Sequence, residues 1–311
     1  MLFINLLFFL IACIFLAGSS NLVVKSLVKI SKYYEFSEFV IGFIIIAFAT
    51  SLPELFVAIM SSLSKIPALS LGNVIGSNIV NLTLVIGIAT LLGKRVKIET
   101  EIEKRDIFYS SIIALLPLVL FLDHQLSRTD GIALILVFFL YVARLYVQRK
   151  KFKKVVDGVV RKEIPKEVII FVFSLVTLLL SSKFIVQFAS LLAIELALQP
   201  IFIGLIILSI GTTLPEISFE AHSVIKGYSG MALGNLLGSV VTNSALVLGV
   251  GATICPIEAY FPSFLTGAIF LIALLGIFSI FAKTNKEISR KEGIVLLIFY
   301  VLFIIVNILT R

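Results

Sequence analysis

The chain is organised as long apolar runs separated by short polar stretches. Ten runs stand out, at residues 2–24, 37–63, 69–93, 107–122, 131–147, 167–190, 199–225, 230–253, 260–282 and 293–310. Most have the roughly 17–25 apolar residues that a helix needs to cross a bilayer. No run alternates apolar and polar residues as a barrel strand would. The pattern predicts an all-α integral membrane protein with ten transmembrane helices.

Residues 39–92 and 201–254 repeat each other at a constant offset of 162 residues, with 18 identities in 54 positions. The copies cover the second and third runs of each half of the chain. Five runs per half is an odd number, so the second half is expected to enter the membrane in the opposite orientation. We therefore predict two inverted repeats of five helices, residues 1–147 and 167–311, joined by a basic loop at 148–166. This layout is typical of secondary transporters whose site lies at mid-membrane.

Charge and composition narrow the class of protein. Charged residues make up only 14% of the chain and hydrophobic residues 59%. Most of the 26 Lys and Arg residues lie in loops after odd-numbered runs, which argues against a nucleic-acid surface. The positive-inside rule predicts a multi-pass protein of the cell membrane with both termini outside and the 148–166 loop in the cytoplasm, beside anionic lipid. No nucleic acid and no obligatory protein partner is expected.

Two glutamates mark the candidate site. Glu54 and Glu216 are each the eighteenth residue of an apolar run, so inverted packing brings them together near mid-membrane. A charge at that depth is costly and usually functional. Helical i,i+4 spacing places further oxygens beside them, at Thr50, Ser77, Asn81, Thr212, Ser239 and Asn243. An all-oxygen set with two carboxylates suits a hard cation such as Ca²⁺ or Na⁺, and the set itself contains no histidine or cysteine that would favour zinc or copper.

Simpler explanations exist for single members of this set. A membrane Ser or Thr usually bonds its own backbone, and glycines four apart often serve close packing. The acid, the proline before it and the asparagine recur at one offset, which favours a shared site. Pro53 and Pro215 are also expected to free backbone carbonyls around Ala49 and Gly211. Glu220 has no acidic counterpart, because Ala58 occupies the matching position in the first copy. Three alternatives stay open for Glu220: it lines an inner vestibule, it takes up a proton, or it is merely paired or solvated.

The motifs T-S/T-L-P-E and G-N-x-x-G-S-x-x-x-N, each present twice, closely resemble the two α-repeats of the Na⁺/Ca²⁺ exchangers of the cation/Ca²⁺ exchanger superfamily, of which this chain looks like a prokaryotic member. The resemblance implies that Glu54 and Glu216 are the central Ca²⁺ carboxylates and that Asn81 and Asn243 complete the centre. It also implies flanking Na⁺ sites made by Thr50, Ser51, Ser77, Thr212, Thr213 and Ser239, with carbonyls near Ala47 and Ser209.

The resemblance further implies an antiporter, not an enzyme, which exchanges Na⁺ for Ca²⁺ by alternating access and needs no cofactor beyond the transported ions. The first and sixth helices, outside the repeated segments, would move against the rest. Asn243 stands where many relatives carry Asp, which disfavours K⁺ dependence. The alternative is an H⁺-coupled exchanger of Ca²⁺ or of another divalent cation such as Mn²⁺. The T-x-P-E motif disfavours it, because the proton-coupled branch typically has G-N-x-x-E.

Overall fold

The protein is mostly helical in the computed structural model, which describes residues 2–33, 46–98, 101–148, 164–284 and 286–309. Within these ranges eight helical stretches are long and apolar enough to cross a membrane: Phe3–Val23, Ala68–Gly93, Arg105–Asp123, Arg128–Val147, Ile164–Glu195, Ser229–Ile254, Phe261–Lys283 and Arg290–Leu309. They coincide with eight of the ten apolar runs. The protein is therefore a multi-pass membrane protein.

The two remaining runs are the ones that carry the glutamates. Pro200–Thr212 and Leu214–Ile225 form a pair of helices bent by 43°, which together count as a ninth span. Leu52–Leu63 is a shorter apolar helix. The start of its run, residues 37–45, lies outside the described residues, so the prediction of a tenth span is not tested there. Most of the predicted 148–166 loop also lies outside them.

The elements follow one another in two similar series. The first comprises α1 (Leu2–Tyr33), α3 (Ala47–Thr50), α4 (Leu52–Leu63), α5 (Ala68–Val80), the π-helical turn η2 (Asn81–Val85), α6 (Ile86–Gly93), β1 (Arg95–Lys97), α7 (Glu101–Leu120), the 3₁₀ turn η3 (Phe121–Asp123), β2 (Gln125–Leu126) and α8 (Arg128–Gln148). The second comprises α9 (Ile164–Glu195), α10 (Pro200–Ile203), the π-helical turn η6 (Gly204–Leu208), α11 (Ser209–Thr212), α12 (Leu214–Ile225), α13 (Ser229–Val241), the π-helical turn η7 (Thr242–Val247), α14 (Leu248–Ile254), β3 (Ile257–Glu258), α15 (Phe261–Thr284), β4 (Glu287–Ser289) and α16 (Arg290–Leu309).

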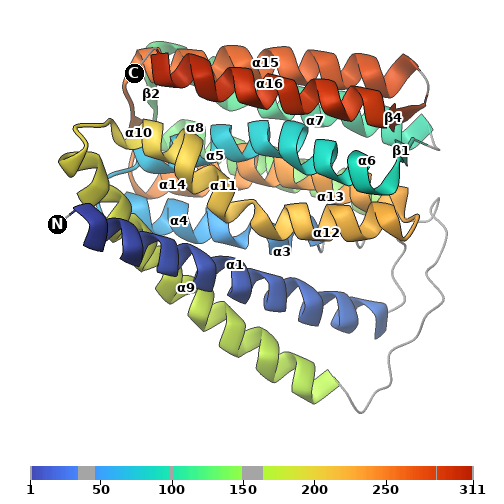
Figure 1. The fold of residues 1–311 in the computed structure, drawn as a ribbon, viewed down its shortest axis with the longest axis horizontal. Coiled ribbons are helices and arrows are strands. Elements are labelled where there is room, and N and C mark those ends of the chain that lie inside the picture. Colours follow the sequence, from blue (N-terminus) through green and yellow to red (C-terminus); the bar gives the residue numbers. More distant parts are fainter. Residues whose placement is uncertain (1, 34–45, 99–100, 149–163, 285, 310–311) are drawn as a thin grey trace.

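The helices form layers, with α1 and α9 side by side on one flank and α15 and α16 on the other (Figure 1). The shorter helices that hold the repeated motifs lie between them. Two hydrophobic cores divide the interior. The larger core contains side chains from helices α5 through α8 and from helices α13 through α16. In the smaller core, α1 and α9 pack against the repeated segments. The α1–α9 pair, defined by these two helices, therefore has its own apolar contact with the remainder.

Two short antiparallel sheets tie the ends of the bundle together. β1 pairs with β4, with Val96 opposite Ile288, and β2 pairs with β3, with Leu126 opposite Ile257. The β1–β4 sheet lies at one end of the bundle, whereas β2 lies at the other, where α1 begins and α16 ends (Figure 1). Each sheet joins a strand from the first half of the chain to one from the second, so the halves are interlocked.

A further repeat appears at the starts of α8 and α16. Ser127 N–H donates to Asp130 Oδ2 at 2.9 Å, and Asp130 N–H donates back to Ser127 Oγ at 3.2 Å. Ser289 N–H and Glu292 Oε2 form the same reciprocal cap at 2.6 Å, again 162 residues later. Both are capping boxes, which satisfy the free amides of a helix start. The likeness of the two halves thus extends beyond the repeated motifs.

The prolines act differently from the expectation of one interrupted helix. Pro53 and Pro215 lie in the first turns of α4 and α12, where proline's missing N–H costs no helical hydrogen bond. The chain turns at the residues just before, Ser51 and Thr213, whose ψ angles are both 1°. A new helix therefore begins at mid-run in each copy. Each glutamate consequently stands in a first helical turn rather than in a helix interior.

Candidate functional site

The candidate residues are all buried. Their exposed fractions are 1% for Ser51 and 0% for the other eleven, which are Ala47, Thr50, Glu54, Ser77, Asn81, Ser209, Thr212, Thr213, Glu216, Ser239 and Asn243. They come from α3, α4, α5 and η2 of the first half and from their counterparts α11, α12, α13 and η7 of the second. So many polar side chains without solvent require internal partners or a ligand.

The threonine of the first copy bonds the motif of the second. Thr50 Oγ1 donates to Asn235 Oδ1 at 3.2 Å and lies 3.2 Å from Ser239 Oγ. Both partners belong to α13, where Asn235 and Ser239 lie one turn apart on one face. The bend before α4 is therefore held against the opposite copy.

The threonine of the second copy makes the same contacts in return. Thr212 Oγ1 donates to Asn73 Oδ1 at 3.1 Å and lies 3.2 Å from Ser77 Oγ. Each of these residues is 162 positions from its counterpart in the previous set. Ser77 also donates to Glu54 Oε1 at 3.2 Å, which connects the network to a carboxylate. Asn73 and Asn235 were not predicted as site residues, although both stand in the repeated G-N-x-x-G motif.

The two carboxylates lie within electrostatic range of each other. Glu54 and Glu216 also stand in the first turns of α4 and α12. A helix start carries partial positive charge, which stabilises a carboxylate there. The asparagines approach from the other copy, because η2, which begins with Asn81, packs against α12, and η7, which holds Asn243, packs against α4.

Unpartnered polar atoms concentrate at this place. Glu54 Oε2, both carboxylate oxygens of Glu216, both amide atoms of Asn81, Asn243 Oδ1 and Ser51 Oγ are buried and have no hydrogen-bond partner among the described residues. Each buried polar atom left without a partner costs about 1–3 kcal/mol. A native protein tolerates such a group of atoms where a ligand supplies the missing contacts. Most of these atoms are oxygens, the atom type that binds hard cations such as Na⁺ and Ca²⁺.

One asparagine is oriented by a residue that the sequence did not single out. Asn243 Nδ2 donates to Asn78 Oδ1 at 3.3 Å, and Asn78 Nδ2 donates to Ser244 Oγ at 2.7 Å. Because Asn78 accepts the N–H of Asn243, the free atom of that amide is its oxygen. Asn78 therefore leaves the Oδ1 atom of Asn243 available as an acceptor. Its counterpart in the repeat is Val240, so the repeat gave no signal for it.

The hydroxyls and carbonyls predicted to flank the centre are mostly engaged. The carbonyl of Ala47 accepts from Ser51 N–H at 3.1 Å and from Thr50 Oγ1 at 3.3 Å. The carbonyl of Ser209 accepts from Thr213 N–H at 3.1 Å and from Thr213 Oγ1 at 2.6 Å. A cation at either position would share these oxygens or displace a hydroxyl donor. Ser51 differs from Thr213 because its hydroxyl has no partner.

Glu220 is fully buried, which excludes the solvated alternative in this conformation. Its Oε1 accepts a hydrogen bond from Asn235 Nδ2 at 3.2 Å, and its Oε2 has no partner. Among the described residues no group of three or more His, Cys, Asp or Glu side chains gathers closely enough to hold one metal ion. The other side chains around Glu54 and Glu216 are therefore neutral hydroxyls and amides. Glu220 does not form a single three-carboxylate cluster with them.

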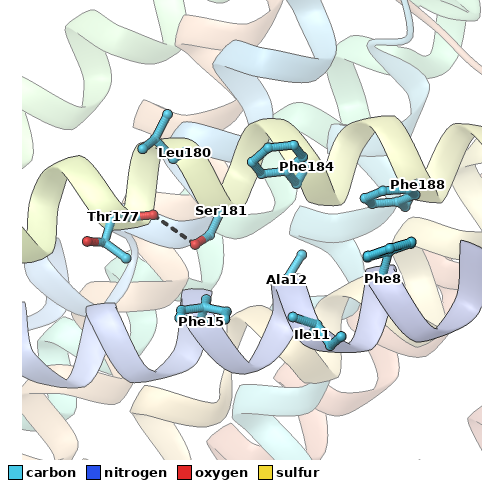
Figure 2. A pocket seen from close by; sticks show the side chains of 9 residues that line it. All are labelled: Phe8, Ile11, Ala12, Phe15, Thr177, Leu180, Ser181, Phe184 and Phe188. Atoms are coloured by element: carbon cyan, nitrogen blue, oxygen red, sulfur yellow. Dashed lines mark hydrogen bonds between the residues drawn. The ribbon is translucent and has the colours of Figure 1, made fainter.

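A large cavity lies away from these oxygens. It has a volume of about 420 Å³ and opens between α1 and α9, lined mainly by Phe8, Phe15, Leu180, Phe184 and Phe188. Figure 2 shows these side chains converging from the two helices, with Phe8 and Phe188 facing each other. Their rings stack at 5.3 Å. Its two polar lining side chains, Thr177 and Ser181, donate their hydroxyls to backbone carbonyls of α9, so this largely apolar cavity offers a cation few ligands.

Comparison with known proteins identifies the family. The sequence model of the sodium/calcium exchanger protein family matches residues 4–147 and, separately, residues 166–309. This chain belongs to that family. It is therefore a transporter and not an enzyme, and cation/Ca²⁺ exchange is its class of activity.

Individual relatives extend over nearly the whole chain. The sodium/calcium exchanger MaX1 of Methanosarcina acetivorans is 30% identical, covering 98% of this chain and 99% of its own length. A putative antiporter, CaxA of Alkalimonas amylolytica, is 31% identical, with 95% and 96% covered. The solved structure of the sodium–calcium exchanger NCX_Mj soaked with Na⁺ and Sr²⁺ is 25% identical, with 98% and 99% covered and a TM-score of 0.72.

Proposed function

We propose that this exchanger is an antiporter that moves Na⁺ one way across the membrane and Ca²⁺ the other, at a single oxygen site built by both copies of the repeat. The observation that carries the proposal is the group of buried, unpartnered oxygens on Glu54, Asn81, Glu216 and Asn243. Two carboxylates balance one Ca²⁺, and carboxylate, amide and carbonyl oxygens are the ligands it prefers.

Na⁺ is the proposed coupling ion because hard oxygens near the centre remain available to a small cation. Ser51 Oγ is free, while Thr50, Ser77, Thr212, Thr213 and Ser239 offer hydroxyls that can exchange a protein hydrogen bond for an ion. The relatives named above include exchangers whose own names specify sodium and calcium. Competition of Na⁺ and Ca²⁺ for shared oxygens makes their binding mutually exclusive, which is the requirement for exchange.

We also propose that the architecture is two inverted five-helix repeats, residues 1–147 and 167–311, joined by the loop at 148–166. Three observations support it: the exchanged threonine contacts, the two sheets at opposite ends, and the separate match of the family model to each half. Lys94, Arg95, Lys226 and Arg290 lie near the β1–β4 end. The positive-inside rule would place that end in the cytoplasm and both termini outside.

Alternating access would follow from movement of the α1–α9 pair against the rest. This pair packs on α3, α4, α11 and α12, the elements that carry the bends. Its contact with them is a separate apolar core, which can slide without breaking hydrogen bonds of the site. The movement would expose the oxygens first to one side of the membrane and then to the other.

Uptake of radioactive Ca²⁺ into proteoliposomes tests the proposal. An outward Na⁺ gradient should drive uptake, and an outward H⁺ gradient without Na⁺ should not. E54Q should abolish the Na⁺-driven signal, whereas E195Q, which changes an exposed acid on α9 bonded to Asn5, serves as the matched control. Uptake driven by the pH gradient alone would instead establish proton coupling, and a second series with Mn²⁺ reports the divalent selectivity.

A further inference from the structure

Glu220 is a buried acid that the exchange mechanism above leaves unused. It lies on α12, one helical turn beyond Glu216, and its exposed fraction is 0%. The corresponding residue of the first copy is Ala58, which is also buried. The site therefore has an additional carboxylate on one side only.

The bond to Asn235 does not explain why an acid is present. In the first copy the matching asparagine, Asn73, has Ala58 in place of an acid, and its Nδ2 is left without a partner. Asn73 nevertheless accepts from Thr212 just as Asn235 accepts from Thr50. The asparagine can therefore perform its role without a carboxylate beside it. The presence of Glu220 requires another reason.

The second oxygen of Glu220 suggests that reason. Glu220 Oε2 is buried and unpartnered, and no ion pair joins Glu220 to a described basic side chain. Glu216 lies within electrostatic range, and both of its own oxygens are free. Two charged carboxylates on successive turns of one helix face destabilise each other, and either a proton on one of them or a cation between them relieves the repulsion. Their three free oxygens provide a place for a cation.

We propose that Glu220 and Glu216 form a second cation position, which holds a monovalent cation, Na⁺, one helical turn from the central Glu54–Glu216 pair. The inference rests on the proposed Na⁺/Ca²⁺ exchange. Ca²⁺ takes six to eight oxygen ligands, often from several carboxylates, and fits the centre better. Glu220 lies on the C-terminal side of Glu216 in α12, toward the end of the helix where Val224 contacts Gly93. The proposed position is therefore next to the central pair on the side of the molecule where α12 ends.

Direct binding to the purified protein in detergent tests this position without transport. The probe is Na⁺ alone, followed by the rise it causes in the melting temperature, with Ca²⁺ alone as the second titration. E220Q keeps an acceptor for Asn235 but removes the charge. We expect its half-saturating Na⁺ concentration to rise about tenfold, with a clearly smaller change for Ca²⁺. E54Q should retain Na⁺ binding that the double variant E54Q/E220Q loses.

Two further variants serve as controls. E195Q, which changes an exposed acid at the end of α9, should give the same Na⁺ and Ca²⁺ titrations as the unaltered protein. E220A removes the acceptor of Asn235 Nδ2, so that this atom loses its partner as Asn73 Nδ2 does in the first copy. If E220Q fails to fold, E220A should show the same rise in the half-saturating Na⁺ concentration. Unchanged Na⁺ binding in both Glu220 variants, or an equal loss of Na⁺ and Ca²⁺, would overturn the second position and leave the exchange function standing. Failure of the unaltered protein to bind or move Ca²⁺ would instead overturn the proposed function.

Discussion

The oxygens of the candidate site divide into two parts that differ in how firmly they are held. Glu54 is bonded by Ser77, and Asn243 is bonded by Asn78; these two residues form the fixed part. Within the part of the chain that the structure describes, no hydrogen bond holds the side chains of Glu216 and Asn81, and these two residues form the free part. Each part combines a glutamate from one copy with the asparagine of the other, whose elements pack together. A duplicated sequence has thus produced unequal halves.

The difference suggests a division of roles. The fixed part presents oxygens already in position, so a cation loses little free energy in organising them. The free part is unsatisfied until a cation arrives, and it can follow the bends before α4 and α12 as they move. Exchange needs both properties, because a fully rigid cage would bind tightly and release slowly. Four predictions test this comparison.

The largest effect is expected from removing either charge. E54Q and E216Q should each reduce Na⁺-driven Ca²⁺ uptake roughly 100-fold or more, because truncating one partner of a buried charge interaction costs about 2–5 kcal/mol. The Ca²⁺ affinity of the purified protein, measured by calorimetry, should fall in both variants. Substantial uptake in either variant would show that the two parts do not act on one ion.

The interlocking of the halves should show in stability. A Cβ on Gly72 would meet the carbonyl of Ile201, whereas a Cβ on Gly276 of α15 would meet nothing within 4 Å. Gly72→Ala should lower the free energy of unfolding by about 1–3 kcal/mol through overpacking. Gly276→Ala should be neutral or stabilising, as alanine usually is in a helix. Equal melting temperatures for the two variants would contradict the close contact of α5 and α10.

Release of the fixed asparagine should weaken binding less. Asn78→Val installs the residue found at the corresponding position, Val240, and frees the amide of Asn243 to rotate. We expect Ca²⁺ affinity to fall about tenfold, within the 10–100-fold range seen when a residue that orients a metal ligand is lost. Ser244→Ala, one step further from the ion, should cost less. An unaltered affinity in Asn78→Val would remove the distinction between fixed and free parts.

The smallest effect is expected from the threonines that cross between the copies. Thr212→Val removes a hydroxyl bonded to Asn73 and Ser77, and hence loosens the serine that holds Glu54. The apparent affinity for Ca²⁺ should fall by about fivefold, in line with the 0.5–1.5 kcal/mol of one hydrogen bond. Thr50→Val, the matching change in the other copy, should have an effect of similar size, because the Thr50 hydroxyl bonds Asn235 and Ser239. Thr212→Ser retains the hydroxyl and should restore binding.

The sequence revealed the residues that repeat and overlooked those that do not. Glu54 and Glu216 were found because each interrupts an apolar run at the same offset. Asn78 was overlooked because Val240 occupies its counterpart, and its contact with Asn243 spans 165 residues. The paired S-R-x-D/E caps of α8 and α16 were readable in the sequence and would have extended the repeat to the fifth helix of each half.

The sequence by itself determined that the protein spans a membrane, where eight of its spans lie, and that two acids interrupt its apolar runs. Hydrophobic length and the expense of a buried charge are local properties, and they can be read from neighbouring residues. Only the tertiary structure decided which oxygens are engaged and which are free. The contacts between the two copies join residues 135 to 189 positions apart, and they depend on how two copies of one segment interlock.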